Sequence, residues 1–283
     1  MKRELSFGFV ADGGLTSGIG HLRRSRALLD ICEDMGIISR FFLPSEFTPK
    51  CSRYLTHVWI DLPYPIPETL LNSLDSSSQK IVALDPSSRG PFDLEIFVVN
   101  HGNAPKSGNV CVGLEYAIIR PEILAERDSI VNNGKVLVCL GGADVREVGS
   151  EVIQRLASGG VQSTWVLGPH AAEPTCAQEG IETFRNPDHF SHLLSQCSWA
   201  ITNGGATAME LMFLGKPVHV LPQTNAEARL SRLFLRDKAI LGIGFEELNI
   251  RPSSVTLEKV GRNARTLIDG QGARRIIKEV LAL

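Results

Sequence analysis

The sequence predicts an α/β protein built from two doubly wound domains, and three observations support this prediction. The chain has 283 residues, roughly twice the length of a typical domain of about 150 residues. Short apolar stretches alternate with amphipathic ones, which is the pattern of parallel sheets flanked by helices. Each half also opens with an apolar strand that runs into a glycine-containing loop and then a helix. We therefore expect two similar domains that face one another across a cleft.

In the first half, one helix stands out from the pattern. Residues 21–35 place Leu28, Cys32 and Met35 on one face, and Gly36 follows where a helix commonly ends. The expected strands of this half occupy residues 5–11, 39–43, 57–60, 80–84 and 95–99. Between 43 and 57 the chain has hardly enough room for a full crossover helix.

The second half begins after a polar, turn-rich stretch at residues 126–134. We therefore expect one domain over 1–128 and another over 129–283, with the final helix a candidate to pack back on the first domain. The expected strands of this half occupy 135–140, 164–167, 182–184, 199–202 and 217–221. The expected helices occupy 145–157, 188–196, 207–214, 225–236, 255–268 and 272–281.

Composition excludes several classes of function. Lys and Arg number 29 against 31 for Asp and Glu, so the net charge of −2 offers no broad attraction to nucleic acid or anionic lipid. No apolar run approaches the roughly 20 residues of a membrane span, and the N-terminus lacks the pattern of a signal peptide. The six cysteines are scattered without a CxxC pair. Free thiols of this kind are typical of a reducing compartment, so we expect a cytoplasmic protein.

The first glycine loop, residues 12–21, joins the first strand to the first helix. Its glycines allow a ligand to approach the backbone, but their spacing matches neither the dinucleotide fingerprint nor the P-loop. His21 lies at the start of the helix, where the helix dipole favours the neutral, proton-accepting imidazole. A general base is one interpretation of His21, and a packing or capping histidine is the other. The arginines after it are either solvated helix charges or phosphate contacts.

Two further glycine loops follow strands of the second half. One contains Gly141 and Gly142, and the other runs through Asn203, Gly204 and Gly205 to a helix that begins near Thr207. A helix start after paired glycines suits a diphosphate, and Glu210 one turn later suits ribose hydroxyls. A tight strand–helix connection with a solvated Glu210 is the alternative. His189 and His192 lie three residues apart, but no third ligand accompanies them, so we expect no metal site.

Five segments together resemble a known family, the UDP-sugar hydrolases of pseudaminic acid biosynthesis. They span residues 18–24, 113–122, 141–144, 204–217 and 268–275, so the likeness covers nearly the whole chain. The resemblance implies the GT-B fold, which inverting glycosyltransferases share. It also implies release of UDP without a metal or cofactor, with His21 as the general base.

The resemblance also implies a set of residues that bind the substrate. These are Asp12, Gly18, Gly20, Arg24, Asp61, Tyr64, Tyr116, Arg120, Gly141, Gly142, Asn203, Gly204, Gly205, Thr207, Glu210 and Asn225. The chain departs from the family pattern at several points. Val10 replaces an arginine, the segment from Asp61 to Tyr64 is one residue too long, Asp85 is followed by Pro86 instead of Asp, and Asn225 is followed by Ala226 instead of Gln.

The sequence is therefore compatible with three alternative functions. The first is hydrolysis of a UDP-activated amino or deoxy sugar by water. The second is transfer of the sugar to an acceptor hydroxyl on the same fold. The third is binding of a nucleotide-sugar without catalysis.

Overall fold

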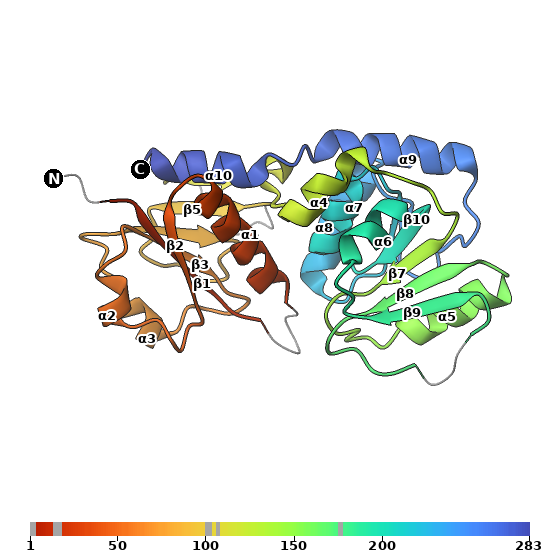
Figure 1. The fold of residues 1–283 in the computed structure, drawn as a ribbon, viewed down its shortest axis with the longest axis horizontal. Helices are drawn as coiled ribbons and strands as arrows, with labels where there is room; N and C mark the ends of the chain where they lie inside the picture. The colour runs from red at the N-terminus through yellow and green to blue at the C-terminus, as the bar shows by residue number, and fades with distance from the viewer. Residues whose placement is uncertain (1–3, 14–18, 100–103, 106–107, 175–177) are drawn as a thin grey trace. The chain divides into compact units, whose positions relative to one another are not determined.

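The computed structural model describes residues 4–13, 19–99, 104–105, 108–174 and 178–283, and it divides into two compact units. The first unit comprises Met1–Arg120 and Gly270–Leu283, and the second comprises Pro121–Asp269 (Figure 1). The division falls earlier than residue 128 because α4 (Pro121–Ala125) and η2 (Glu126–Asp128) pack with the second unit. There the buried carboxylate of Glu126 accepts a hydrogen bond from Ser195 Oγ at 2.8 Å.

The first unit, as far as it is described, holds one parallel six-stranded sheet in the order β2-β1-β3-β4-β5-β6. Its strands are β1 (Ser6–Ala11), β2 (Ile38–Phe42), β3 (His57–Asp61), β4 (Lys80–Leu84), β5 (Leu94–Phe97) and β6 (Val110–Val112). All carboxyl ends lie at one edge because the strands are parallel. The chain runs from β1 to β2 on one side and from β3 onward on the other, so the strand order reverses between β1 and β3. Open α/β sheets bind ligands outside the carboxyl ends at such a point.

Two long helices cover one face of this sheet, α1 (Gly20–Asp34) and α10 (Gly272–Leu281) (Figure 1). Leu28 of α1 and Ile277 of α10 are fully buried in one core with Phe9 and Trp59 of the sheet. A second core, which includes Val58 and Leu70, packs with two short helices, α2 (Pro49–Ser52) and α3 (Glu68–Leu71). The chain between β2 and β3 thus contains one helical turn instead of a full crossover helix.

The second unit repeats the plan with a described sheet in the order β12-β11-β10-β7-β8-β9, again parallel. Its strands are β7 (Val136–Cys139), β8 (Ser163–Leu167), β9 (Ile181–Arg185), β10 (Trp199–Thr202), β11 (Val218–Val220) and β12 (Gly242–Ile243). Its longer helices are α5 (Gly149–Ser158), α6 (Phe190–Gln196), α7 (Ala206–Phe213), α8 (Asn225–Arg236) and α9 (Ser254–Leu267). The strand order reverses between β7 and β10.

The predicted fold class is confirmed, while the cleft between the halves stays a prediction. The sequence pattern did not predict two strands, β6 and β12, because they are only three and two residues long. The helix expected from 145 begins instead at Gly149. The Asp144 carboxylate accepts hydrogen bonds from the N–H groups of Val148 and Gly149, at 3.2 and 2.6 Å, and so holds a turn before the helix. No helix in the described residues is long and apolar enough to cross a membrane.

The last helix gives a direct test of the first unit's core. Replacing Ile277, which is fully buried, by Ala should lower the free energy of unfolding by about 2–4 kcal/mol, because a cavity forms beneath α10. Lys278→Ala on the exposed side of the same helix should change it by less than about 0.5 kcal/mol. Hydrogen exchange of the β1 and β3 amides would measure both. Equal losses in the two variants, or no loss in either, would show that α10 does not stabilise this sheet.

Candidate functional site

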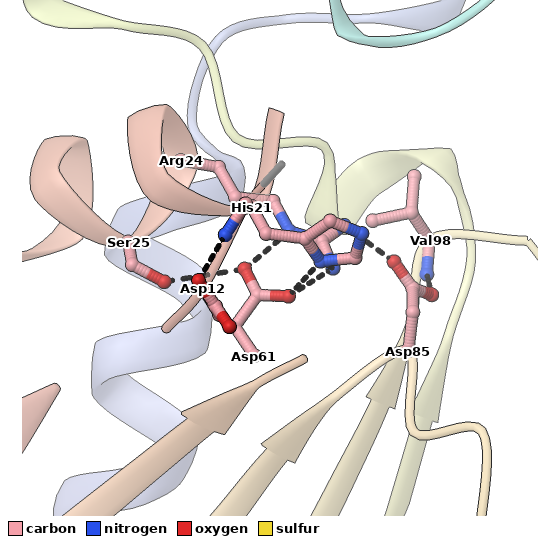
Figure 2. Close-up of polar contacts among 8 residues, drawn as sticks. Asp12, His21, Arg24, Ser25, Asp61, Asp85 and Val98 are labelled. Carbon is pink, nitrogen blue, oxygen red and sulfur yellow. Dashed lines mark hydrogen bonds and ion pairs between the residues drawn. The ribbon is translucent and has the colours of Figure 1, made fainter. Parts of the chain in front are cut away.

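Three aspartates lie at or directly after the carboxyl ends of adjacent strands in the first unit. Asp61 ends β3, Asp12 follows β1, and Asp85 follows β4. The first turn of α1 brings His21 and Arg24 to the same place, beside the reversal point of the sheet. Figure 2 shows these side chains gathered above the arrowheads of the strands.

His21 and Asp61 form a close pair. His21 Nδ1 lies 2.5 Å from Asp61 Oδ1, and the Asp61 side chain is only 1% exposed. An ionised carboxylate can only accept a hydrogen bond, so Nδ1 carries the proton and Nε2 keeps its lone pair. A partner on one ring nitrogen thereby sets which nitrogen can act as a base.

Arg24 neutralises the buried aspartate. Its Nε and Nη2 donate to the two oxygens of Asp61 at 2.6 and 2.5 Å, which is the bidentate arrangement that binds carboxylates strongly. Ser25 Oγ donates a further bond at 3.2 Å. Burial by itself would raise the pKa of Asp61, but the charge and hydrogen bonds of Arg24, with those of His21, outweigh it and lower the pKa to about 2. Asp61 is therefore ionised throughout the neutral range.

Asp85 binds the other side of the same guanidinium. Arg24 Nη1 donates to Asp85 Oδ2 at 2.6 Å, and the backbone N–H of Val98 donates to Oδ1 at 3.1 Å (Figure 2). Three N–H groups of Arg24 are thus engaged by carboxylates. The two aspartates therefore determine the position of the Arg24 guanidinium, and a contact of Arg24 with substrate stays a prediction.

Asp12 and Tyr64 form a second pair at this edge. The Tyr64 hydroxyl donates to Asp12 Oδ2, and the backbone N–H of Gly13 donates to Oδ1 at 2.7 Å. Burial, followed by the hydrogen bond to Asp12, raises the pKa of Tyr64 to about 12. Tyr64 therefore stays protonated and keeps Asp12 in place.

In the second unit, the two predicted glycine loops meet where the strand order reverses. Gly141 follows β7 and Gly204 follows β10, and both have the positive φ, 86° and 89°, that glycine tolerates. A Cβ on Gly141 would lie 3.1 Å from Asn203 Nδ2, so the loops touch. The helix after the second loop, α7, begins at Ala206 without a side-chain cap. Its first N–H groups therefore offer donors to an anion.

Glu227 joins these loops to the next one. Its Oε1 accepts from Asn203 Nδ2 at 2.5 Å, and its Oε2 accepts from the backbone N–H groups of Gln223 and Thr224 at 2.7 and 3.2 Å. Burial raises the pKa of the Glu227 carboxyl, against these hydrogen bonds, which favour its charged form. The sequence reasoning missed this residue, although Thr224 and Glu227 have the spacing of a capping box, which the structure contains.

A cavity of about 310 Å³ opens beside this cluster, at the carboxyl ends of β11 and β12. Arg146, Pro222 and Phe245 are among its lining residues. Arg146 Nη1 donates to the carbonyl of Pro222 at 3.1 Å, and its backbone N–H donates to Gln223 Oε1 at 2.8 Å. Another cavity, of about 270 Å³, lies around Ser6 and Ile38 at the opposite edge of the first sheet, away from His21.

The other predicted site residues fall in different surroundings. Gly18 lies outside the described residues, and Gly20 is the first residue of α1. Tyr116, in η1 (Leu114–Tyr116), packs on the core beneath α10, and a hydrogen bond with Cys111, then burial, raises its pKa to about 12. Arg120 is half-buried at the end of the first unit.

The remaining three belong to helices of the second unit. Thr207 is half-buried in the first turn of α7, Glu210 is buried in the same helix, and Asn225 is exposed at the start of α8. No group of three or more potential metal-ligating side chains occurs in the described parts of the chain.

The fold is that of the GT-B proteins. MurG from Acinetobacter baumannii is similar with a TM-score of 0.66 and 9% sequence identity, over 99% of this chain and 100% of that one. Other similar solved structures are glycosyltransferases and UDP-GlcNAc 2-epimerases. At such low identity the likeness establishes the fold alone.

Two characterised sequences are similar over nearly the whole chain, and no family model matches it. The first is the "Pseudaminic acid cytidylyltransferase and UDP-2,4-diacetamido-2,4,6-trideoxy-beta-L-altropyranose hydrolase" of Helicobacter pylori, 21% identical over 100% of this chain and 57% of its own length. The second is the spore coat polysaccharide biosynthesis protein SpsG of Bacillus subtilis, 23% identical over 95% of this chain and 96% of its own. The resemblance expected from the motifs is thereby confirmed. The chain spans little more than half of the Helicobacter protein.

The buried aspartate predicts how stability depends on pH. Folding lowers the pKa of Asp61 from 3.8 to about 2, so its ionisation stabilises the folded state above pH 3.8 and this contribution is lost as pH falls toward 2. The difference amounts to about 2 kcal/mol. The gap in unfolding free energy between the wild type and Asp61→Asn should therefore shrink by about that amount from pH 6 to pH 2, as measured by urea denaturation. A gap that is independent of pH would contradict the assigned ionisation.

Proposed function

We propose that this protein hydrolyses a UDP-sugar, with His21 as the general base. The observation that carries the proposal is the hydrogen bond of 2.5 Å between His21 Nδ1 and the buried, ionised Asp61. This bond leaves Nε2 of His21 as the proton acceptor. A histidine oriented by a carboxylate is a common arrangement for activating a hydroxyl group.

In the proposed reaction, His21 Nε2 takes a proton from a water molecule as the water oxygen attacks the anomeric carbon. The bond between that carbon and the diphosphate oxygen breaks, and UDP leaves with the electron pair. His21 becomes an imidazolium, whose charge Asp61 stabilises through Nδ1. Arg24 and Ser25 hold Asp61 in position during this step. The first unit thus supplies the base.

We propose that the second unit binds the nucleotide. The start of α7 has no side-chain cap, so its first N–H groups and the dipole behind them suit the negative charge that develops on the leaving diphosphate. Gly204 and Gly205 allow the phosphates to approach the backbone closely, and Glu210 accepts hydrogen bonds from the ribose. The cavity between Arg146 and Phe245 suits the base of the nucleotide.

The names of the two similar proteins support a nucleotide-linked sugar as the substrate. The name of the Helicobacter relative includes hydrolysis of a UDP-activated diacetamido-trideoxy sugar, and that of the Bacillus relative indicates polysaccharide biosynthesis. We propose a substrate of the same class for this chain, a UDP-linked amino or deoxy sugar on its way to a surface polysaccharide. The five described cysteines are all free thiols, which supports an enzyme of the reducing cytoplasm.

Transfer to an acceptor is the second candidate, because several proteins with this fold are glycosyltransferases. The same His21 would then deprotonate an acceptor hydroxyl in place of water. UDP release from a panel of UDP-sugars, measured with and without acceptors, separates the two. Release in water alone supports the hydrolase, release only with an acceptor supports the transferase, and binding without release identifies a nucleotide-sugar-binding protein.

The base is tested by His21→Asn, since the Asn amide can still donate to Asp61 and thus preserve the fold. The rate of UDP release should fall about a hundredfold or more, while UDP affinity stays unchanged because its binding residues lie in the second unit. His189→Asn, at an exposed histidine in the N-cap position of α6 whose side chain makes no capping hydrogen bond, should retain the wild-type rate. If His21→Asn retains that rate too, His21 is not the base.

The nucleotide site is tested by Glu210→Gln, which keeps the shape of the side chain but removes its charge. UDP binding should weaken by about 1–3 kcal/mol through the loss of a charged hydrogen bond to the ribose. Calorimetry would measure it, with Glu151→Gln on an exposed position of α5 as the control. Unchanged affinity in Glu210→Gln would remove Glu210 from the site.

A further inference from the structure

Asp85 occupies an unusual backbone conformation beside the proposed base. Its φ is +44°, in the left-handed region that residues other than glycine rarely adopt, and Pro86 follows it. Such a conformation persists only where the surroundings enforce it. Here the Asp85 N–H donates to the carbonyl of Ile96 at 2.7 Å, while its carboxylate accepts from Val98 and Arg24. The carboxylate is therefore held in one place against Arg24.

The four side chains form a line of contacts in which the charges alternate once His21 has taken up a proton. His21 contacts Asp61, Asp61 contacts Arg24, and Arg24 contacts Asp85, with each polar distance between 2.5 and 2.6 Å. Arg24 Nη2 also lies 3.3 Å from His21 Nδ1. A positive charge so close to the ring disfavours the imidazolium, whereas Asp61 favours it.

We propose that Asp85 is a positioning residue that acts through Arg24 to set how readily His21 takes up a proton. By offsetting part of the Arg24 charge, Asp85 makes the imidazolium easier to form. The proposal rests on His21 being the base of the proposed hydrolysis, because a base must accept a proton as water attacks. Asp85 itself touches Arg24 and the backbone of β5 and its loop, not the ring.

The charged side chains labelled around His21 in Figure 2 are Arg24 of α1 and the aspartates that end or follow β1, β3 and β4. Tyr64 donates a hydrogen bond to the first of these, Asp12, and remains uncharged. Asp61 and Arg24 balance one another, so Asp85 and Asp12 supply the remaining negative charge. Of these two aspartates, Asp85 is the one that accepts a hydrogen bond from the Arg24 guanidinium beside the histidine.

The variant Asp85→Asn tests this role with little disturbance of shape. Asparagine tolerates positive φ and keeps one acceptor oxygen, but it removes the charge that offsets Arg24. The pH at which the His21 ring titrates, followed by its NMR resonance, should move lower by about half a unit or more. The acid limb of the pH profile of kcat/KM for UDP release should move in the same direction.

The chain offers a matched control in Asp93. Its carboxylate also accepts from one cation, Lys80, and one backbone N–H, that of Ile81. It is 26% exposed against 27% for Asp85, but it directly precedes β5 and contacts the amino end of β4, away from His21. Asp93→Asn should leave the His21 titration where it is in the wild type.

Each outcome decides the proposal. A lower titration pH in Asp85→Asn alone supports it. An unchanged titration in Asp85→Asn, or an equal change in both variants, overturns it. The NMR titration needs no turnover, so failure of the wild type to release UDP would reject the proposed function and still leave the role of Asp85 to be decided by the resonance.

Discussion

A carboxylate that is 1% exposed is stable in a folded protein only if other groups satisfy its charge and its lone pairs, and Asp61 meets that condition entirely through α1. Arg24 supplies the charge and two hydrogen bonds, Ser25 a third and His21 a fourth. These residues lie on the first two turns of one helix. The burial of Asp61 therefore aligns α1 on the end of β3, and the same contacts orient the imidazole. The position of α1 and the proposed chemistry of His21 therefore both depend on the ion pair between Arg24 and Asp61.

Both units place their candidate residues at the carboxyl edge of a parallel sheet, where the strand order reverses, but they use the edge differently. In the first unit Asp61 ends β3, and Asp12 and Asp85 follow β1 and β4, beside the proposed base. In the second unit Gly141 and Gly204, both with positive φ, lie in the loops that follow β7 and β10, and the start of α7 has no side-chain cap. A carboxylate near a leaving diphosphate would oppose its binding, whereas N–H groups at a helix start stabilise it. The proposed function accordingly places the base at the first sheet and the diphosphate at the second.

The second unit also has a carboxylate among its loops, that of Glu227. Its hydrogen bonds run to Asn203 and to the backbone before α8, so it connects the loops that follow β10 and β11. The carboxylate accepts hydrogen bonds from the Asn203 amide and from the N–H groups of Gln223 and Thr224. It thereby holds Asn203 beside Gly141. Its effect is to shape the loops.

The sequence by itself determined the fold class, the order of the main elements and the loops at which to look. Apolar stretches, helix caps and glycine positions are local features, so His21, Gly141 and Gly204 could be predicted as candidate residues without coordinates. Only the tertiary structure decided the partners: it pairs Asp61, a predicted substrate-binding residue, with His21, and it brings Asp85 and Glu227, which were not among the predicted residues, beside other candidate residues. Forty residues separate His21 from Asp61 and sixty-one separate Arg24 from Asp85. Such pairs meet because β1, β3 and β4 are neighbours in one sheet, and strand order is a property of the whole fold that no local pattern encodes.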